Sequence, residues 1–322
     1  MKSEVTGKTG GELLAETGLV CSVTNLPSLE QAKQVFDYIP TSEGTREDYK
    51  ARIGDFVEFL NINGLNFDSL LEYRKYLEAR ADYSVSTKNK YFATAKRYVG
   101  VLYTTGIIPK DISKDISGVD IKGFQQDKKH KKDGVNTDEM ERLAEYFRAL
   151  PNTPENKRLK AIFALFIYQG LRQVEIARLD VTDIDLRTGK VFIRGKGRDD
   201  KEPVALHPHT TEALRDYLSA YNKKSGALFT SQSHNANGER LTTRSIRSFV
   251  EKVFKTLNIP NSAHGFRHYF TTSLIKSYGG DLLAVAHYTR HRSLEMLQVY
   301  NDQIKAEEDL PRYISVFEGV QL

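Results

Sequence analysis

Six side chains in the second half of the chain are of types that could bind a phosphate diester and attack it. They are Arg172, Lys196, His264, Arg267, His291 and Tyr300. Two arginines can each hold phosphate oxygens through paired hydrogen bonds, and they stay charged at any working pH. A tyrosine hydroxyl can attack phosphorus to form a covalent intermediate, while histidine and lysine can move the protons. The set therefore predicts transfer of a phosphodiester bond to a tyrosine.

Each of these residues is a weak signal when it is taken alone. Arg172 follows a glycine at the end of a helical pattern, where a surface arginine is the more common finding. Lys196 lies between two glycines, and most lysines in such turns are simply solvated. His264 and Arg267 are neighbours on one helical face, which is often a structural pairing, and Tyr300 is one of 17 tyrosines. Their order within one region is what gives them weight.

The composition is that of a folded protein with a modest excess of positive charge. Of the 322 residues, 39% are hydrophobic and 28% are charged, which suits about two packed domains. The formal net charge of +5 fits a polyanionic partner, because Lys and Arg that neutralise phosphates release bound counterions. Charge alone does not identify that partner, since many basic proteins never bind nucleic acid.

Several kinds of site are not expected. Cys21 is the only cysteine, and no Cys/His cluster has the spacing of metal ligands. The chain has no Walker-type phosphate loop and no acidic cluster suited to two magnesium ions, so we expect no metal and no cofactor. No apolar run reaches the roughly 20 residues that cross a bilayer, and the N-terminus lacks the apolar segment of a secretory signal. We therefore expect a cytoplasmic protein with no membrane partner.

Hydrophobic periodicity divides the chain into parts that would position these residues. We expect a flexible arm at 1–26, a helical domain at 27–108, a basic linker at 109–135 and a second domain at 136–322. In the second domain, helical patterns surround three short β-branched runs at 183–186, 190–194 and 203–206. The fold class predicted is mainly α (α+β), with a small antiparallel sheet in the second domain. A last amphipathic stretch at about 303–317 follows Tyr300.

The helical domain at 27–108 could grip DNA phosphates. Three helices are expected, with Thr45 as the N-cap of the first and the third running from about Val85 to Thr105. Cations on the third helix are Lys88, Lys90, Lys96 and Arg97. The linker adds Lys128, Lys129, Lys131 and Lys132. Both sets fit either a solvated surface or contact with a nucleic acid backbone.

Taken jointly, these residues resemble the pattern of the tyrosine recombinase (phage integrase) family, which includes Xer-type recombinases and Cre. Family members carry an arginine with a nearby acid, a lysine on a β-hairpin, H-x-x-R, a histidine or tryptophan, and a nucleophilic tyrosine. The acid here is Glu175, in the run GLR-x-x-E, and the resemblance extends over about 28–316. One departure is Arg290, where family members often have glycine, and Lys201 competes with Lys196 for the place of the lysine.

The resemblance implies roles for the individual residues. Tyr300 would form a 3′-phosphotyrosine, with His264 as the acceptor of its proton. Lys196 would protonate the departing 5′-oxygen, and His291 would bind the phosphate or position Tyr300. Glu175 would orient His264 or Arg172 rather than react. No metal or nucleotide is needed for such a scheme.

The resemblance also implies a site-specific DNA recombinase that works through a Holliday junction in integration, excision or resolution. Its partner would be double-stranded DNA with an inverted-repeat core site. A homotetramer would hold two such sites, exchange the helix at 303–317 between protomers and associate with the nucleoid. That helix packing within its own protomer is the alternative. Two other functions remain open at this point, a type IB topoisomerase-like DNA-relaxing enzyme and a non-catalytic DNA-binding protein on the same scaffold.

Overall fold

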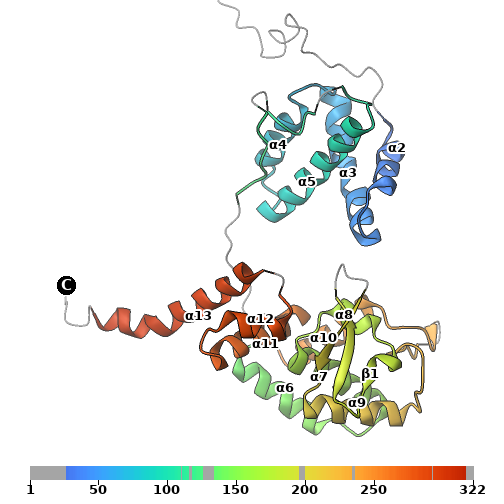
Figure 1. Ribbon diagram of the computed structural model, residues 1–322, viewed down its shortest axis with the longest axis vertical. Helices are drawn as coiled ribbons and strands as arrows, with labels where there is room; N and C mark the ends of the chain where they lie inside the picture. The colour runs from blue at the N-terminus through green and yellow to red at the C-terminus, as the bar shows by residue number, and fades with distance from the viewer. Residues whose placement is uncertain are drawn as a thin grey trace, which may run out of the picture. The chain divides into compact units, whose positions relative to one another are not determined.

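The chain forms two compact units that divide between Asp127 and Lys128. A computed structural model describes residues 27–109, 111–115, 118–125, 134–195, 200–233, 236–291 and 293–316 (Figure 1). Within that part of the chain, no helix is both long and apolar enough to cross a membrane. The fold class is the mainly helical one that we expected, with a single three-stranded antiparallel sheet among the described residues.

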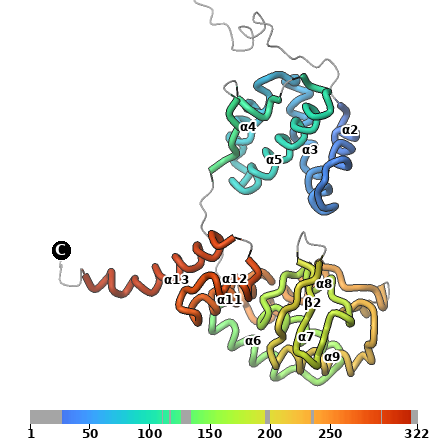
Figure 2. Tube along the Cα trace, viewed as in Figure 1, coloured from blue at the N-terminus to red at the C-terminus, as the bar shows by residue number. Residues whose placement is uncertain are grey.

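Helices build the first unit, traced in blue and green in Figure 2. Its elements are α2 (Leu29–Gln34), the 3-10 turn η1 (Val35–Tyr38), α3 (Glu43–Asn63), α4 (Ser69–Ala79) and α5 (Val85–Thr104). The expected N-cap at Thr45 is wrong, because Ser42 caps α3 and accepts a hydrogen bond from the Thr45 backbone N–H. The helix therefore starts one turn earlier, because the Ser42 side chain satisfies a backbone N–H of its first turn.

Residues beyond α5 pack into the core of the first unit. Ile108, Ile112 and Ile121 are buried there together with the aromatic residues of α3, α4 and α5. Asn89 exchanges two hydrogen bonds with the backbone of Phe124, at 2.9 and 2.7 Å. The described residues up to 125 thus belong to this unit, although we assigned 109–135 to a linker. Ile112 and Ile121 stand singly among polar residues and give no periodic signal, which is why the sequence pattern assigned them to a linker.

The second unit surrounds the buried helix α7 (Pro154–Gln169). The other helices are α6 (Thr137–Ala149), α8 (Gln173–Arg178), α9 (Pro208–Ala220), α10 (Thr243–Thr256), α11 (Ala263–Ser277), α12 (Leu282–Thr289) and α13 (Leu294–Ser315). Phe163 and Phe166 of α7 contact Phe266 of α11, with ring centroids 5.5 and 5.7 Å apart. This aromatic contact fixes α11 against the centre of the unit, and α11 carries two of the predicted site residues.

A small sheet lies beside these helices. Strands β1 (Ile184–Asp185), β2 (Lys190–Arg194) and β3 (Lys201–Ala205) pair antiparallel in that order, with Arg194 opposite Lys201. Val191 and Ile193 alternate with exposed residues on β2 and point into the core, as the period-two pattern predicts. The hairpin that would carry Lys196 therefore exists, although residues 196–199 lie outside the described part.

The last helix is longer than expected. Ser293 caps α13 by accepting a hydrogen bond from the backbone N–H of Glu295, so the helix begins nine residues before the predicted stretch at 303–317 and contains Tyr300. It continues through Pro311 without ending, and its far half projects from the rest of the second unit (Figure 1). The first half of α13 packs on α11 and α12, where Leu297 and Ile304 are buried.

Candidate active site

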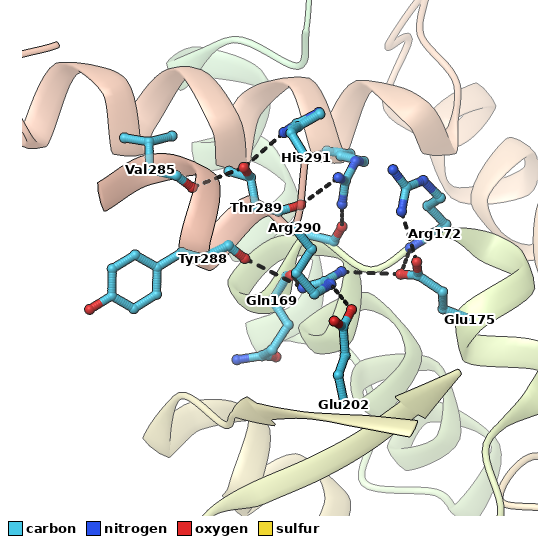
Figure 3. A network of polar contacts seen from close by, with 11 residues as sticks. Gln169, Arg172, Glu175, Glu202, Val285, Tyr288, Thr289, Arg290 and His291 are labelled. Atoms are coloured by element: carbon cyan, nitrogen blue, oxygen red, sulfur yellow. Dashed lines mark hydrogen bonds and ion pairs between the residues drawn. The ribbon is translucent and has the colours of Figure 1, made fainter. Parts of the chain in front are cut away.

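Arg172 is held by a buried carboxylate at the start of α8. Glu175 is 1% exposed; its Oε2 accepts from the Arg172 backbone N–H at 2.8 Å and its Oε1 from the Arg172 guanidinium at 2.9 Å. One side chain thus fixes both the backbone and the guanidinium of Arg172 (Figure 3). Of the two roles expected for Glu175, these contacts are those of the residue that orients Arg172.

A tight turn places Arg172 beside α11. Gly170 ends α7 in the left-handed conformation, at φ 57° and ψ 31°, which glycine adopts without strain. A Cβ atom there would lie 2.4 Å from Cδ1 of Phe270 on α11. The turn from α7 to α8 therefore requires a residue without a side chain, both for its backbone angles and for the close approach of α11.

Arg267 joins two chain segments of the site. Its side chain is nearly buried, and it donates to the carbonyl of Gly170 at 2.8 Å and to that of Thr289 at 2.6 Å. These carbonyls end α7 and α12, directly before the segments that carry Arg172 and His291. Arg267 therefore brings three parts of the sequence to one place and keeps further N–H groups for an anion.

His291 is neutral and its ring is oriented. The Thr289 hydroxyl donates its proton to the carbonyl of Val285 at 2.9 Å, so it accepts at 2.8 Å from Nδ1 of His291 (Figure 3). That arrangement assigns the proton to Nδ1 and leaves the lone pair on Nε2. Burial, followed by the charges of Arg267 and Arg172, lowers the pKa of His291 to about 3. At neutral pH the Nε2 atom is therefore a hydrogen-bond acceptor.

Tyr300 lies beside His268 of α11, whose ring also contacts that of His264. The ring of His268 is 5.1 Å from that of Tyr300 and 4.6 Å from that of His264, which is exposed near the start of the helix. Tyr300 itself is 5% exposed and borders a pocket of about 190 Å³. Burial raises the pKa of Tyr300 to about 12, although the charge of Arg267 opposes the rise. Ionisation of this phenol in the free protein is therefore unfavourable.

The site carries more positive than negative charge. Burial, together with the nearby Arg172 and Arg290, lowers the pKa of Arg267 to about 9, so its guanidinium is still charged at neutral pH. Glu175 is the buried carboxylate among these cations, and burial would raise its pKa, but Arg290 and Arg172 hold it below its ordinary value. An excess of buried positive charge suits an anion such as a phosphodiester.

The lysine of the predicted set has no described position, because Lys196 lies outside the described residues. Its competitor Lys201 starts β3 and forms an ion pair with the buried carboxylate of Asp183. Lys201 is thus engaged at the base of the hairpin, and Lys196 stays the prediction for the proton donor. Among the residues that the structure describes, no group of three or more His, Cys, Asp or Glu side chains could hold a metal ion.

The four cations of α5 are not alike. Lys88 donates to the carbonyl of Glu78 at 2.8 Å, and Lys96 pairs with Asp120 at 3.0 Å, so both are used within the first unit. Lys90 and Arg97 are exposed. Contact with DNA stays a prediction for this helix, with Lys90 and Arg97 as its best candidates. The linker cations Lys128, Lys129, Lys131 and Lys132 lie outside the described residues.

Two residues near the site were missed. Arg290 was noted only as a departure from a family pattern, yet its guanidinium lies 3.1 Å from Glu175. His268 was not among the predicted site residues, yet its ring lies next to Tyr300. A signal for His268 was present, since it is one helical turn from His264 on the same face. Nothing local to Arg290 indicated its partner 115 residues away.

Comparisons with known proteins identify the family and the fold of this chain. Residues 135–307 match the phage integrase family. Tyrosine recombinase XerC of Thermodesulfovibrio yellowstonii is 26% identical over 292 residues, which cover 86% of this chain and 90% of that protein. Tyrosine recombinase XerD of Oceanobacillus iheyensis is 29% identical over 293 residues, covering 79% and 94%.

Two solved structures share the fold. The XerH site-specific recombinase bound to palindromic difH substrate, in its post-cleavage complex, superposes with a TM-score of 0.66 at 18% identity, covering 97% of this chain and 91% of that one. A lambda integrase dimer bound to a COC′ core site gives 0.61 at 11% identity, covering 92% and 82%. At these identities the likeness concerns the fold alone.

Proposed function

Because this chain belongs to the phage integrase family, we propose that it is a site-specific DNA recombinase that cuts and rejoins strands through a 3′-phosphotyrosine at Tyr300. One observation carries the proposal. Arg172, Arg267, His291 and Tyr300 come from four segments of the sequence, and their charges and rings lie close enough to interact. Such a cluster is what attack on a backbone phosphate needs.

In the proposed reaction, the Tyr300 hydroxyl oxygen attacks the scissile phosphorus and the bond from phosphorus to the 5′-oxygen breaks. The guanidinium groups of Arg172 and Arg267 stabilise the negative charge that develops on the non-bridging oxygens; a catalytic arginine contributes roughly 10³-fold or more at other phosphoryl-transfer sites. The phenol proton passes to His264, and Lys196 protonates the departing 5′-oxygen. Reversal with a new 5′-hydroxyl rejoins the strand and restores the enzyme.

The neutral His291 ring has a defined part in this scheme. Its Nε2 atom can only accept a hydrogen bond while Nδ1 is committed to Thr289. Of the two roles expected for His291, positioning the Tyr300 hydroxyl fits an acceptor, whereas binding a phosphate oxygen needs a donor. A bound phosphodiester offsets the nearby arginine charges and favours protonation, which would add the donor later in the reaction.

The test is covalent trapping. A core site with a nick near the scissile phosphate should give a protein–DNA adduct that survives denaturant, because the cleaved end diffuses away and religation fails. Tyr300→Phe should abolish the adduct, whereas Tyr278→Phe, which changes a half-exposed tyrosine at the end of α11, should leave it unchanged. No adduct from the unaltered protein on its own site would refute the proposal. Relaxation of supercoils without site preference would instead indicate the topoisomerase function.

The partner we propose is double-stranded DNA with an inverted-repeat core site, bound in the cytoplasm as part of the nucleoid. Recombination then requires a homotetramer on two sites, held by exchange of the far half of α13. Support comes from three largely apolar side chains on that half, which are 52–62% exposed: Leu310, Tyr313 and Ile314. Ile304 is buried within its own chain, so the exchanged part would begin at about Lys305.

Removal of residues 305–322 tests the assembly proposal. The truncated protein should keep its DNA affinity and its fold, because the buried residues of α13 remain. It should lose tetramer formation on DNA and recombination. Gel mobility of the complexes, together with recombination of a two-site plasmid, measures both properties. Normal recombination by the truncated protein would rule out exchange of this helix.

A further inference from the structure

Arg290 ends α12 in a backbone conformation that side chains seldom adopt. Its φ of 57° and ψ of 37° are left-handed, and its backbone N–H closes the helix on the carbonyl of Ala286 at 2.8 Å. Its side chain is only 8% exposed, and it points into the second unit beside Glu175 (Figure 3). Glycine would suit these angles better, so the presence of arginine here calls for a reason in its side chain.

The Arg290 guanidinium contacts four segments at once. Its Nη2 lies 3.1 Å from Oε2 of Glu175, and its Nε lies 3.6 Å from Oε1 of Glu202 on β3. Its Nη1 is 3.4 Å from the carbonyls of Gln169, at the end of α7, and of Tyr288 on α12. The start of α8, the hairpin strand and two helix ends therefore meet at one side chain.

Glu175 connects this group to the phosphate site. Its Oε1 accepts from the Arg172 guanidinium, while Oε2 is shared between the Arg172 backbone and Arg290. With both oxygens occupied, the buried carboxylate has one orientation, and so has Arg172. Without Arg290, the carboxylate would keep contacts only from Arg172 and could turn with it. A buried carboxylate also needs compensating charge.

We propose that Arg290 is a positioning residue of the phosphate site, which fixes Glu175 and through it Arg172, and which holds β3 through Glu202. Arg290 acts from behind the site, since its side chain is nearly buried and its guanidinium faces Glu175 and Glu202. The inference rests on the proposed recombinase function. It also links Arg290 to the predicted proton donor, because Arg290 contacts β3 and the segment that contains Lys196 directly precedes β3 in the sequence.

The pH dependence of cleavage separates this role from a merely structural one. The charged groups around Glu175 are Arg172 at the N-cap of α8, Arg267 on α11 and Arg290 at the C-cap of α12, with Glu202 of β3 beside Arg290. Burial raises the pKa of the Glu175 carboxyl, and Arg290 is the strongest of the groups that lower it. Loss of Arg290 should therefore let Glu175 take up a proton at a pH where the unaltered protein keeps it ionised, and Arg172 would lose its anchor.

Arg290→Gly is the test variant, because glycine accepts the left-handed backbone and retains the N–H bonded to Ala286. Arg290→Lys keeps one cation but cannot reach both carboxylates in the geometry of a guanidinium. Asn258→Gly is the matched control: Asn258 is an exposed left-handed residue (φ 51°) just beyond α10, and it is not one of the residues assigned to the site. The assays are the rate of adduct formation on the nicked site, the Kd for DNA and thermal unfolding.

Arg290→Gly should slow adduct formation roughly 10- to 100-fold, the equivalent of one charged hydrogen bond, while the Kd for DNA stays within about threefold. The rate of the unaltered protein divided by that of Arg290→Gly should grow as the pH falls from about 7 to about 5, because Glu175 takes up a proton in the variant first. Titrations that are common to both proteins cancel in this ratio. The rate of adduct formation in Arg290→Lys should lie between those of the unaltered protein and Arg290→Gly. The rate in Asn258→Gly should equal that of the unaltered protein.

Other results would overturn the inference. One such result is an unchanged rate of adduct formation in Arg290→Gly. Another is a slower rate that is explained by weaker DNA binding and shows no change in pH dependence. Both would leave the recombinase proposal standing. If the unaltered protein forms no adduct, the recombinase proposal fails. Thermal unfolding then still tests the contact between Arg290 and Glu175. Arg290→Gly and Glu175→Gln should then be non-additive in a double-mutant cycle, and additive losses of stability would remove the link between them.

Discussion

Replacing Gly170 with alanine tests whether the turn before Arg172 depends on the close approach of α11. Two costs are expected. The first is the left-handed backbone at φ 57°, which costs an alanine about 1–2 kcal/mol. The second is the contact of the new Cβ with the Phe270 ring, whose three nearest atoms lie at 2.4, 2.8 and 3.0 Å. Overpacking of this kind typically costs about 1–3 kcal/mol.

Gly189→Ala is the control for the backbone cost alone. Gly189 has a φ of 64°, and a Cβ added there would meet nothing within 4 Å. For a unit of this size, each kcal/mol lowers Tm by about 2–4 °C. Gly189→Ala should thus lower the Tm of the second unit by roughly 2–8 °C, and Gly170→Ala should lower it by a further 2–12 °C. Calorimetry of the full chain separates the transitions of the two units.

Cleavage should fall more in Gly170→Ala than the loss of folded protein explains, because the Gly170 carbonyl accepts from Arg267 and Arg172 lies two residues on. Gly170→Ala should cost less stability when it is introduced into Phe270→Leu than when it is introduced into the unaltered protein, because the smaller side chain leaves room for the new Cβ. Equal Tm changes in Gly170→Ala and Gly189→Ala would refute the reasoning. They would mean that the ring of Phe270 moves aside at little cost.

Two further predictions concern charge. His291→Asn keeps a donor for Thr289 but cannot titrate. Because the folded pKa of His291 is about 3, below its ordinary 6.5, the unaltered protein should lose stability relative to this variant as the pH falls from 6.5 towards 3. Urea midpoints at several pH values measure the difference, and a constant difference would contradict the burial of a neutral ring. Lys90→Ala and Arg97→Ala should each reduce the slope of log K for DNA against log salt by about 1. Lys96→Ala, whose ammonium pairs with Asp120, should change that slope less, and a larger change would contradict the assignment.

Much of the fold could be predicted because its signals are local. The turn residues around β2 mark the sheet, so β1, β2 and β3 lie within two residues of the predicted runs. The start of α13 differs because Tyr300 and the residues before it were interpreted as an isolated motif. In fact the Ser293 cap begins one continuous helix that contains the motif and the tail.

The candidate site was predicted as a set of residues, but not as an arrangement. The order of Arg172, His264, Arg267 and Tyr300 follows from the sequence, whereas the contact of Glu175 with Arg290 depends on two helix ends meeting in space. The same holds for the ion pair between Lys201 and Asp183, two residues 18 positions apart in the sequence. Contacts between distant segments leave no mark on local periodicity.

The two backbone contacts of Arg267 bear on the choice of an inert protein for trapping complexes on DNA. Arg267→Ala would leave the carbonyls of Gly170 and Thr289 buried without their donors, each at about 1–3 kcal/mol, and would loosen the segments that present Arg172 and His291. A preparation of that variant would mix unfolded molecules with catalytically silent ones. Tyr300→Phe removes one oxygen and keeps the ring against His268, so it gives a silent protein whose shape is intact.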